Sequence, residues 1–208
     1  MATLKVSSLS ITLPNGQKLC NDLSFEVAAG EVLALTGPSG SGKSSILAWL
    51  TGTLAPGLHS QGQAFLDDKE LTHLPAERRR LGLMLQQDYL FPHMTVGQNL
   101  LFGLPKGRRS VRWEKVRESL SAAGLADMEN RDPSTLSGGQ RARVSLLRTL
   151  LSEPEALLLD EPFSRLDSDR RSQIRDFTWR SAATLPILLV THDTGDIPEN
   201  ARTVSLQG

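Results

Sequence analysis

The sequence predicts an α/β fold with an antiparallel N-terminal β-subdomain and a helical insertion. Residues 4–36 carry the alternating apolar pattern of β-strands. Residues 87–135 lose the strand pattern and take up helical spacing instead. From residue 137 onward, helices again alternate with short apolar strands, which is typical of a parallel sheet covered by helices. We expect residues 1–208 to form a single domain, with 87–135 as the insertion.

The first part of the chain is expected to consist mainly of strands. The turn signal Pro14–Gln17 separates two alternating runs, and the apolar run Val32–Thr36 predicts a buried strand. A helix is expected to start near Ser45, after a glycine-rich loop. The expected strands lie at 6–13, 19–27, 32–36, 63–66 and 81–85. The basic triplet Arg78–Arg80 is interpreted as a solvated face.

The insertion is expected to be helical, and the α/β alternation returns after it. In the insertion, Trp113, Val116 and Leu120 recur at helical spacing, and Gly124 suits the end of that helix. The expected helices lie at 96–102, 110–123, 137–152 and from 168 onward, and the later strands at 156–159, 187–190 and 203–206.

Composition and charge exclude several classes of protein. Lys and Arg number 23 and Asp and Glu number 23, so nothing global points to nucleic acid or to an anionic membrane surface. The one cysteine, Cys20, cannot form an internal disulfide, which suits a reducing cytosol. No apolar stretch approaches the ~20 residues of a membrane helix, and the N-terminus lacks the apolar core of a signal peptide. We therefore expect a cytoplasmic protein.

A phosphate-binding loop is predicted between the strand at 32–36 and the following helix. The loop matches the pattern G-x-x-x-x-G-K-[ST] at every fixed position. Its glycines and the helix start offer backbone N–H groups to an anion, Lys43 would reach the β- and γ-phosphates, and the Ser44 hydroxyl would ligate Mg²⁺. The expected nucleotide-binding residues here are Gly37, Pro38, Ser39, Gly40, Ser41, Gly42, Lys43, Ser44 and Ser45. The bland alternative is a glycine-rich turn without a ligand.

Two acidic residues end the apolar strand that includes Leu157–Leu159. In a parallel sheet this places Asp160 at the carboxyl edge, where ligands gather. Asp160 is expected to hold Mg²⁺, and Glu161 is placed to act as the general base for an attacking water. The alternative is a strand that runs into an exposed acidic turn.

A second anion site is predicted at the start of the helix near residue 137. Ser137 would cap this helix, and two glycines expose backbone N–H groups at its positive end. One chain with one phosphate loop has little use for this site unless it serves a nucleotide held by another copy. The alternative is a capped helix with no further role.

These segments make the chain resemble the ATP-binding subunits of ABC transporters, from about residue 4 to the end. The matching motifs are Walker A at Gly37–Ser44, the signature at Leu136–Gln140, Walker B at Leu157–Glu161, the D-loop at Ser164–Asp167, the switch histidine His192 and the Q-loop glutamine Gln86. Gln87 is adjacent, but the register of Phe91–Val96 favours Gln86. The resemblance implies the P-loop NTPase fold of ABC ATPases.

The resemblance further implies an ATPase that works as a head-to-tail dimer with ATP as substrate. Each ATP would lie between the Walker A loop of one copy and the signature of the other. The residues acting on the partner's nucleotide would be Ser137, Gly138, Gly139, Gln140 and Asp167. Glu161 would activate water, His192 would contact the γ-phosphate, and Gln86 would sense Mg²⁺ as a ligand and move the insertion. The insertion would meet membrane permease subunits on the inner face of the cell membrane, with a solute-binding protein as an indirect partner.

Two positions depart from the family pattern. The family usually has an aromatic residue that stacks on adenine, and the register places Leu13 there. The D-loop usually carries a small residue where this chain has Arg165.

Many importer subunits carry a C-terminal regulatory domain, which is not expected here. The stretch Phe91–Val96 resembles bacterial importers of small solutes, with thiamine, sulfate and molybdate types closest.

Two rival functions are compatible with a phosphate-binding loop. A soluble ABC-type ATPase acting on nucleic acid or ribosomes would usually show long coiled-coil insertions or two fused cassettes, and this sequence shows neither. A non-hydrolysing, nucleotide-gated module is disfavoured because Glu161 and His192 are both present. The favoured prediction is an ATP-hydrolysing subunit that powers solute import, with Mg²⁺ as cofactor and no nucleic-acid partner.

Overall fold

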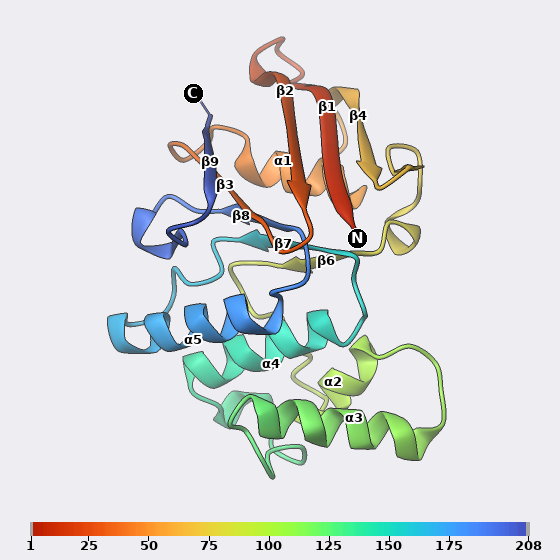
Figure 1. Cartoon of the computed structure of the whole chain (residues 1–208), viewed down its shortest axis with the longest axis vertical. Helices are drawn as coiled ribbons and strands as arrows, with labels where there is room; N and C mark the ends of the chain where they lie inside the picture. The colour runs from red at the N-terminus through yellow and green to blue at the C-terminus, as the bar shows by residue number, and fades with distance from the viewer. Residues whose placement is uncertain (1, 207–208) are drawn as a thin grey trace. The chain divides into compact units, whose positions relative to one another are not determined.

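A computed structural model describes residues 2–206, apart from the side chains of Ser168 and Asp169. The chain divides into two compact units, which Figure 1 shows as ribbons. The sheet unit comprises 1–83, 155–161 and 183–208, and the helical unit comprises 84–154 and 162–182. Within the described residues, no helix has the length and apolar character needed to cross a membrane.

An antiparallel sheet forms the first part of the sheet unit, as the alternating pattern predicts. Its strand order is β2-β1-β4-β5. The strands are β1 (Thr3–Thr12), β2 (Lys18–Ala28), β4 (His59–Leu66) and β5 (Lys69–Glu70). β1 pairs antiparallel with both β2 and β4, and its apolar side chains lie in the core.

The alternation in β1 is only partial because the strand contains an irregularity. The register shifts between Val6 and Leu9, where Ser8 takes a left-handed backbone with φ of +47°. The extra residue keeps Leu9 on the core face, where it is fully buried. On the neighbouring strand, a Cβ at Gly62 would lie 2.7 Å from the Leu9 Cα, so only glycine fits there.

A parallel sheet forms the second part of the sheet unit, with strand order β6-β7-β8-β3-β9. The strands are β3 (Val32–Thr36), β6 (Leu81–Met84), β7 (Ala156–Asp160), β8 (Ile187–Val190) and β9 (Arg202–Ser205). Val190 lies level with Leu35 on one side and Asp160 on the other. The loops that follow β3, β7 and β8 therefore leave the same edge of the sheet, where ligands gather in open parallel sheets.

Helix α1 (Lys43–Thr51) packs its apolar side chains into a core shared by both sheets. Ile46 and Leu50 are fully buried in this core, together with Leu4 of β1 and Leu158 of β7. Cys20 of β2 belongs to the same core, and its Sγ lies 3.7 Å from the Leu9 carbonyl oxygen. Burial raises the pKa of the Cys20 thiol. The core fixes the strand and the helix that flank the phosphate loop.

Arg79 corrects the interpretation of Arg78–Arg80 as a solvated face, because its side chain is only 6% exposed. Its Nη1 donates to the carbonyl oxygens of Trp49 and Leu50, at 2.8 and 2.7 Å. These are carbonyls at the C-terminal end of α1, which a guanidinium can satisfy and whose negative dipole end it complements. The remaining nitrogens donate to the carbonyls of Thr72 and Leu74. Arg79 thus ties α1 to the segment before β6.

The helical unit contains four α-helices around its own core. They are α2 (Val96–Gly103), α3 (Arg109–Ala122), α4 (Gly138–Leu150) and α5 (Ser168–Ser181). The core joins α2, α3 and α4 through the buried residues Leu100, Val116 and Leu147, and Phe177 of α5 packs against it. The unit is therefore larger than the predicted insertion 87–135, because the helices after it share the same apolar core. The described residues also form the 3₁₀ turns η1 (Ala76–Arg78), η2 (Pro133–Thr135) and η3 (Thr194–Asp196).

Candidate functional site

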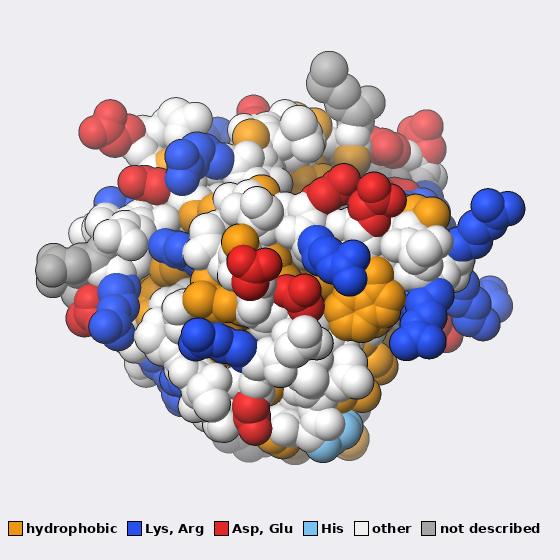
Figure 2. All heavy atoms as spheres, turned by 90° about the horizontal axis from the view of Figure 1, so that it is seen from below, with side chains coloured by type: hydrophobic (Ala, Val, Ile, Leu, Met, Phe, Trp, Pro, Cys, Tyr) orange, Lys and Arg blue, Asp and Glu red, His pale blue; other side chains and the backbone are white. Residues whose placement is uncertain are grey.

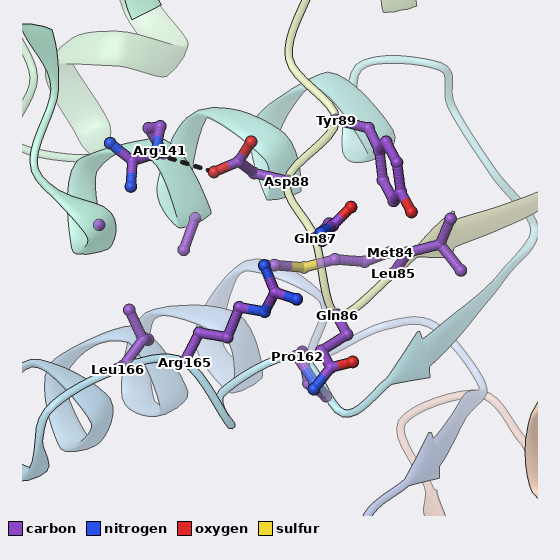
Figure 3. Close-up of a pocket in the computed structure, with 12 residues that line it drawn as sticks. Met84, Leu85, Gln86, Gln87, Asp88, Tyr89, Arg141, Pro162, Arg165 and Leu166 are labelled. Atoms are coloured by element: carbon purple, nitrogen blue, oxygen red, sulfur yellow. Dashed lines mark hydrogen bonds and ion pairs between the residues drawn. The ribbon is translucent and has the colours of Figure 1, made fainter. Parts of the chain in front are cut away.

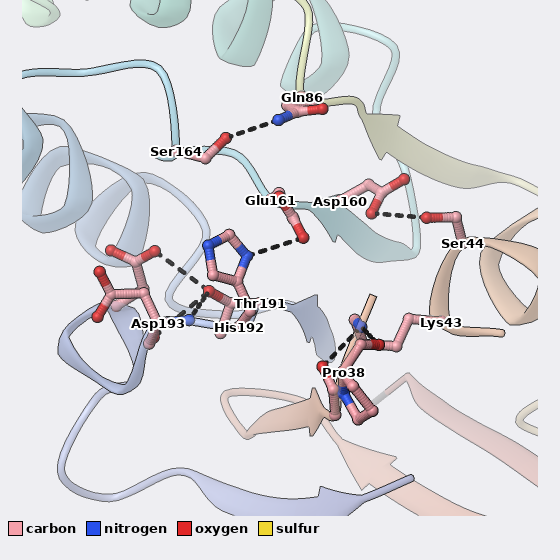
Figure 4. Close-up of polar contacts among 12 residues, drawn as sticks. Pro38, Lys43, Ser44, Gln86, Asp160, Glu161, Ser164, Thr191, His192 and Asp193 are labelled. Atoms are coloured by element: carbon pink, nitrogen blue, oxygen red, sulfur yellow. Dashed lines mark hydrogen bonds and ion pairs between the residues drawn. The ribbon is translucent and has the colours of Figure 1, made fainter. Parts of the chain in front are cut away.

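The loop between β3 and α1 is organised around Lys43, whose side chain is 6% exposed. Its Nζ donates to the carbonyl oxygens of Gly37 and Pro38, at 2.8 and 2.7 Å, and lies 3.4 Å from Ser41 Oγ (Figure 4). The ammonium group, which belongs to a residue at the end of the loop, therefore contacts the carbonyls at the start of the loop. This contact holds the loop curved around the cationic group.

Two glycines of the loop are required by close contacts. Gly42 takes φ of +87°, and a Cβ there would lie 2.9 Å from the Cβ of Leu19. Gly37 takes φ of +146°, and a Cβ there would lie 2.7 Å from the carbonyl oxygen of Leu206. The backbone can close up in this way only without side chains. The resulting arrangement of N–H groups at the start of α1 is a ready-made anion site.

A cavity of about 310 Å³ lies over this loop, within the sheet unit. Its described lining consists of Leu19, Ser39, Gly40, Gly42, Lys43, Ser44, Ser45 and Glu161. Leu13, the residue expected under the base, lies in the turn between β1 and β2 and is not in this lining. Its backbone N donates to the Gln17 carbonyl at 2.8 Å. Leu19 is the apolar side chain of the lining, and sequence reasoning missed it because it counted only as part of an alternating strand.

Ser44 and Asp160 meet at the same edge of the parallel sheet, as predicted. Ser44 Oγ donates to Asp160 Oδ1 at 3.2 Å. Burial raises the pKa of Asp160, and the negative charge of Glu161 raises it further, whereas the Ser44 hydrogen bond and the charge of Lys43 lower it. The two oxygens form a pair of hard ligands beside the loop.

Glu161 and His192 also come together in the sheet unit. Their side chains meet with 2.9 Å between His192 Nδ1 and Glu161 Oε1 (Figure 4). Glu161 has a left-handed backbone, φ +46°, and its N–H donates to the Val190 carbonyl at 2.9 Å. Thr191, only 1% exposed, fixes the turn around His192 because its Oγ1 accepts a hydrogen bond from the Asp193 N–H at 3.1 Å. The carboxylate and the imidazole are thus presented by two neighbouring strand ends.

The signature residues form a capped helix start in the helical unit. Ser137 Oγ accepts from the Gln140 N–H at 3.3 Å, and Gln140 Oε1 accepts from the Ser137 N–H at 2.9 Å. This reciprocal capping box fixes the start of α4. Asp167 caps α5 in the same unit, because its Oδ1 accepts from the Arg170 N–H at 3.1 Å. The predicted cap at Ser137 is confirmed.

Gln86 lies in the helical unit, where its Nε2 donates to Ser164 Oγ at 3.2 Å (Figure 4). The Q-loop and the D-loop of the sequence analysis are therefore in contact. The predicted site residues that the two preceding units present fall into two groups, one in each unit. The sheet unit holds Gly37–Ser45, Asp160, Glu161 and His192, and the helical unit holds Gln86, Ser137–Gln140 and Asp167.

Asn99 organises the segment that follows Gln86, and sequence reasoning missed it. Its side chain is fully buried. Its Nδ2 donates to the carbonyls of Phe91, Met94 and Thr95, at 3.0–3.2 Å, and its Oδ1 accepts from the Phe91 N–H at 2.8 Å. A polar residue three positions after the apolar Val96 and directly before the apolar Leu100 was the available signal.

Arg148 of α4 holds the same segment from the other side. Its Nη1 donates to the Tyr89 carbonyl at 2.9 Å and its Nη2 to the Asp88 carbonyl at 3.1 Å. The guanidinium also lies 5.3 Å from the centre of the Phe91 ring. Arg148 and Asn99 therefore give the segment after Gln86 a defined shape.

Comparison with known proteins decides the family. The profile of the ABC transporter family matches residues 20–164. This chain belongs to the ABC transporter family. This ABC transporter ATPase is 41% identical over 206 residues to the uncharacterized ABC transporter ATP-binding protein YnjD of Escherichia coli K12, with 98% of this chain and 94% of that protein covered. Membership assigns ATP binding and ATP hydrolysis to the chain.

Two other relatives of this ABC transporter ATPase carry the names of import proteins. The chain is 41% identical over 194 residues to the sulfate/thiosulfate import ATP-binding protein CysA 1 of Agrobacterium fabrum, covering 88% of this chain and 55% of that protein. It is also 41% identical over 184 residues to the sulfate/thiosulfate import ATP-binding protein CysA of Synechocystis, covering 86% and 51%. The chain thus spans about half the length of these two relatives.

Proposed function

We propose that this chain is the ATP-hydrolysing subunit of an import system and works with separate membrane permease subunits on the inner face of the membrane. The observation that carries the proposal is the contact of Glu161 with His192 in the unit that also holds the phosphate loop. This arrangement supplies a positioned general base next to a triphosphate site. The names of the two sulfate/thiosulfate relatives favour import of a small solute, chosen by the permease and a solute-binding protein.

The residues at the edge of the sheet fit a magnesium ion. Ser44 Oγ and Asp160 Oδ1, 3.2 Å apart, are oxygen ligands of the kind Mg²⁺ prefers. The described residues contain no cluster of three or more His, Cys, Asp or Glu that would hold a metal by itself. This suits an ion that takes its other ligands from phosphates and water. Bound here, Mg²⁺ would neutralise charge on the phosphates. Gln86 is proposed as a further ligand.

The residues of this chain would then divide the work of hydrolysis. Lys43 and the loop N–H groups bind the phosphates and place the γ-phosphate. Glu161 accepts the proton of the attacking water as general base. His192 holds the Glu161 carboxylate through Nδ1 and leaves Nε2 for the γ-phosphate. The raised pKa of Asp160 reflects the cost of keeping a carboxylate partly buried in this position before a cation arrives.

Two copies of the chain are proposed to share each ATP. The capped start of α4, with Ser137 and its two glycines, is an anion site in the helical unit, which contains no phosphate loop of its own. A nucleotide held by the loop of a partner copy would use this site. Asp167, at the start of α5, is proposed to meet the same partner.

The proposed permease contact lies on the helical unit, where apolar side chains reach the surface. Tyr89 is 58% exposed, Phe102 65% and Val111 47%. A cavity of about 410 Å³ beside Met94, Leu101 and Phe102 adds an apolar hollow. In the space-filling view of Figure 2, hydrophobic side chains emerge between Lys and Arg side chains. Exposed apolar patches of this kind mark protein contacts.

Reconstitution tests the proposal directly. ATP hydrolysis by the chain should rise when permease-containing vesicles are added, and Glu161→Gln should abolish the stimulated activity. Ribosomes and single-stranded nucleic acid serve as comparison additives. If these additives stimulate hydrolysis and the permease does not, the chain is instead a soluble ATPase that acts on nucleic acid or ribosomes.

A further inference from the structure

Two pairs of side chains connect the segment after β6 with the segment after Glu161, and all four residues lie in the helical unit. Gln86 Nε2 donates to Ser164 Oγ at 3.2 Å. The neighbouring Gln87 amide oxygen accepts from Nη1 and Nη2 of Arg165, at 3.1 and 3.2 Å. We call these two pairs the clasp. Figure 3 shows Gln87 and Arg165 in the cavity of about 320 Å³ that they line with Tyr89.

Gln87 extends the clasp to Tyr89. With its oxygen toward Arg165, the Gln87 amide nitrogen donates to Tyr89 Oη at 3.0 Å. The opposite orientation would set the amide nitrogen against the guanidinium, which has only donors. The amide orientation follows from these neighbours. A continuous chain of hydrogen bonds therefore runs from the exposed phenol through Gln87 to the guanidinium.

One end of this chain is exposed and the other is firmly attached. The Tyr89 side chain is 58% exposed, within the surface proposed to meet the permease. Phe163, fully buried, packs edge-on against Trp179 of α5 with 5.8 Å between ring centres. Asp167 caps the start of α5. Ser164 and Arg165 are thus held in a short stretch whose first residue, three positions before Ser164, is Glu161.

The clasp is better suited to transmitting a change of position from Tyr89 than to stabilising the fold. Gln87 and Arg165 are both exposed, and exposed polar pairs contribute little to folding. A guanidinium fork can hold one amide oxygen with two N–H groups, which fixes direction as well as distance. A change at the phenol therefore changes the position of Gln87, and with it the stretch that begins at Glu161.

We propose that Arg165 is a positioning residue that transmits the occupation of Tyr89 by the permease to the segment carrying Glu161. The proposal rests on the proposed function, because it takes the permease as the occupant. Without the permease, Tyr89 is exposed, and only the bonds of the clasp set the position of Arg165 relative to Gln87. When the permease covers Tyr89, the phenol, Gln87 and Arg165 are fixed together, and the arrangement that suits hydrolysis is favoured.

The test compares stimulated with basal ATP hydrolysis. Arg165→Met keeps the length of the side chain and removes the fork. Its basal rate, measured without permease, should stay close to that of the wild type. Its stimulation by permease-containing vesicles should fall about fivefold, the low end of coupling between sites. Tyr89→Phe, which removes only the hydroxyl, should lower stimulation in the same direction, and combining the two should cause little further loss.

Matched variants separate the clasp from general effects. Arg180→Met removes an exposed arginine of α5 outside the clasp and should leave stimulation unchanged. Gln87→Glu should retain stimulation because a carboxylate also accepts from the fork. Gln87→Leu removes the same contact by changing Gln87 and leaving Arg165 in place. If Arg165→Met folds poorly, this variant shows whether the contact is needed for stimulation. Full stimulation of both Arg165→Met and Gln87→Leu would overturn the clasp proposal alone. A wild type that the permease does not stimulate would instead overturn the proposed function.

Discussion

Glu161, the proposed general base, has an unusual backbone conformation. Its left-handed conformation, φ +46°, is uncommon for a residue with a side chain and concentrates at functional sites, where the surroundings enforce it. The enforcing contacts here are the bond from its N–H to Val190 and the ring of His192. A carboxylate fixed in this way needs little reorganisation before it accepts a proton.

Glu161→Gln should bind ATP but turn it over very slowly. The amide keeps the shape and a hydrogen bond to His192, and it removes the base. General-base catalysis contributes about 10²–10⁴-fold, so phosphate release in a single turnover should fall by that factor. The variant should accumulate as an ATP-bound dimer on size exclusion. Hydrolysis at the wild-type rate would mean that another group is the base.

Leu13 and Leu19 are the two candidate residues for contact with the base of the nucleotide. Leu19 lines the cavity over the loop, so Leu19→Ala should weaken ATP binding by about 1 kcal/mol, or roughly fivefold in Kd. If the register of the family pattern holds, Leu13→Tyr should tighten ATP binding by about 1 kcal/mol, the low end of aromatic stacking on a base. Calorimetric titration of ATP and GTP against both variants distinguishes the two positions. Tighter binding in Leu13→Tyr with no change in Leu19→Ala would assign the base to Leu13.

At the scale of elements, α1 is held at both ends. Its start forms the phosphate loop around Lys43, and the carbonyl oxygens at its end accept hydrogen bonds from Arg79. The guanidinium is buried, and burial lowers its pKa. Four carbonyl oxygens surround it, so the contacts replace those the group would make with water.

Arg79→Leu should therefore destabilise the fold. Losing charged hydrogen bonds to buried carbonyls costs about 3 kcal/mol, which corresponds to a fall in Tm of roughly 6–12 °C for a chain of this size. Arg79→Lys should recover only part of the stability lost in Arg79→Leu, because an ammonium group cannot reach all four carbonyls as the guanidinium does. The control is Arg78→Leu, an exposed neighbour, which should change stability by less than about 0.5 kcal/mol. Thermal unfolding of the three variants measures these differences. Equal Tm values for Arg79→Leu and Arg78→Leu would show that Arg79 does not stabilise the end of α1.

The same element illustrates what the sequence can predict. The strand, loop and start of α1 follow from local pattern. So do Asp160 and His192, because Asp160 ends an apolar strand and His192 comes two residues after one. The burial of Arg79 could not be predicted, since its partners lie up to 30 residues earlier and meet it only in the folded chain. Asn99 was missed although its partners lie only 4–8 residues earlier, because their backbone groups turn toward its side chain only in the folded loop.

At the scale of the whole molecule, the predicted motifs are divided between two units. Walker A, Walker B and the switch histidine belong to the sheet unit, and the signature and Gln86 belong to the helical unit. The balanced charge of 23 basic and 23 acidic residues sets up no strong overall repulsion between copies. Both facts agree with a catalytic assembly of more than one chain.

Hydrolysis should accordingly need two chains. Specific ATPase activity should rise with protein concentration. A sharper test mixes two inactive variants: Lys43→Ala, which lacks the loop lysine, and Gly138→Asp, which places a negative charge at the start of α4. A Cβ at Gly138 meets only ordinary contacts, so this variant should fold. The mixture should regain activity, since one composite site in the mixed dimer is intact. Activity per chain that stays constant down to a demonstrated monomer would contradict the prediction.

Because Cys20 is buried, the rate at which its thiol is alkylated measures how often the N-terminal sheet opens. Cys20 is 8% exposed, and burial raises the pKa of its thiol, so an alkylating reagent should react mainly when the N-terminal sheet opens. Its neighbour Leu19 lines the cavity over the phosphate loop. Saturating ATP should therefore slow alkylation of the wild type, whereas Lys43→Ala, with weakened ATP binding, should show little slowing. The rate of one chemical reaction would follow nucleotide occupancy without any added label, and a rate indifferent to ATP in the wild type would show that this sheet moves independently of the nucleotide.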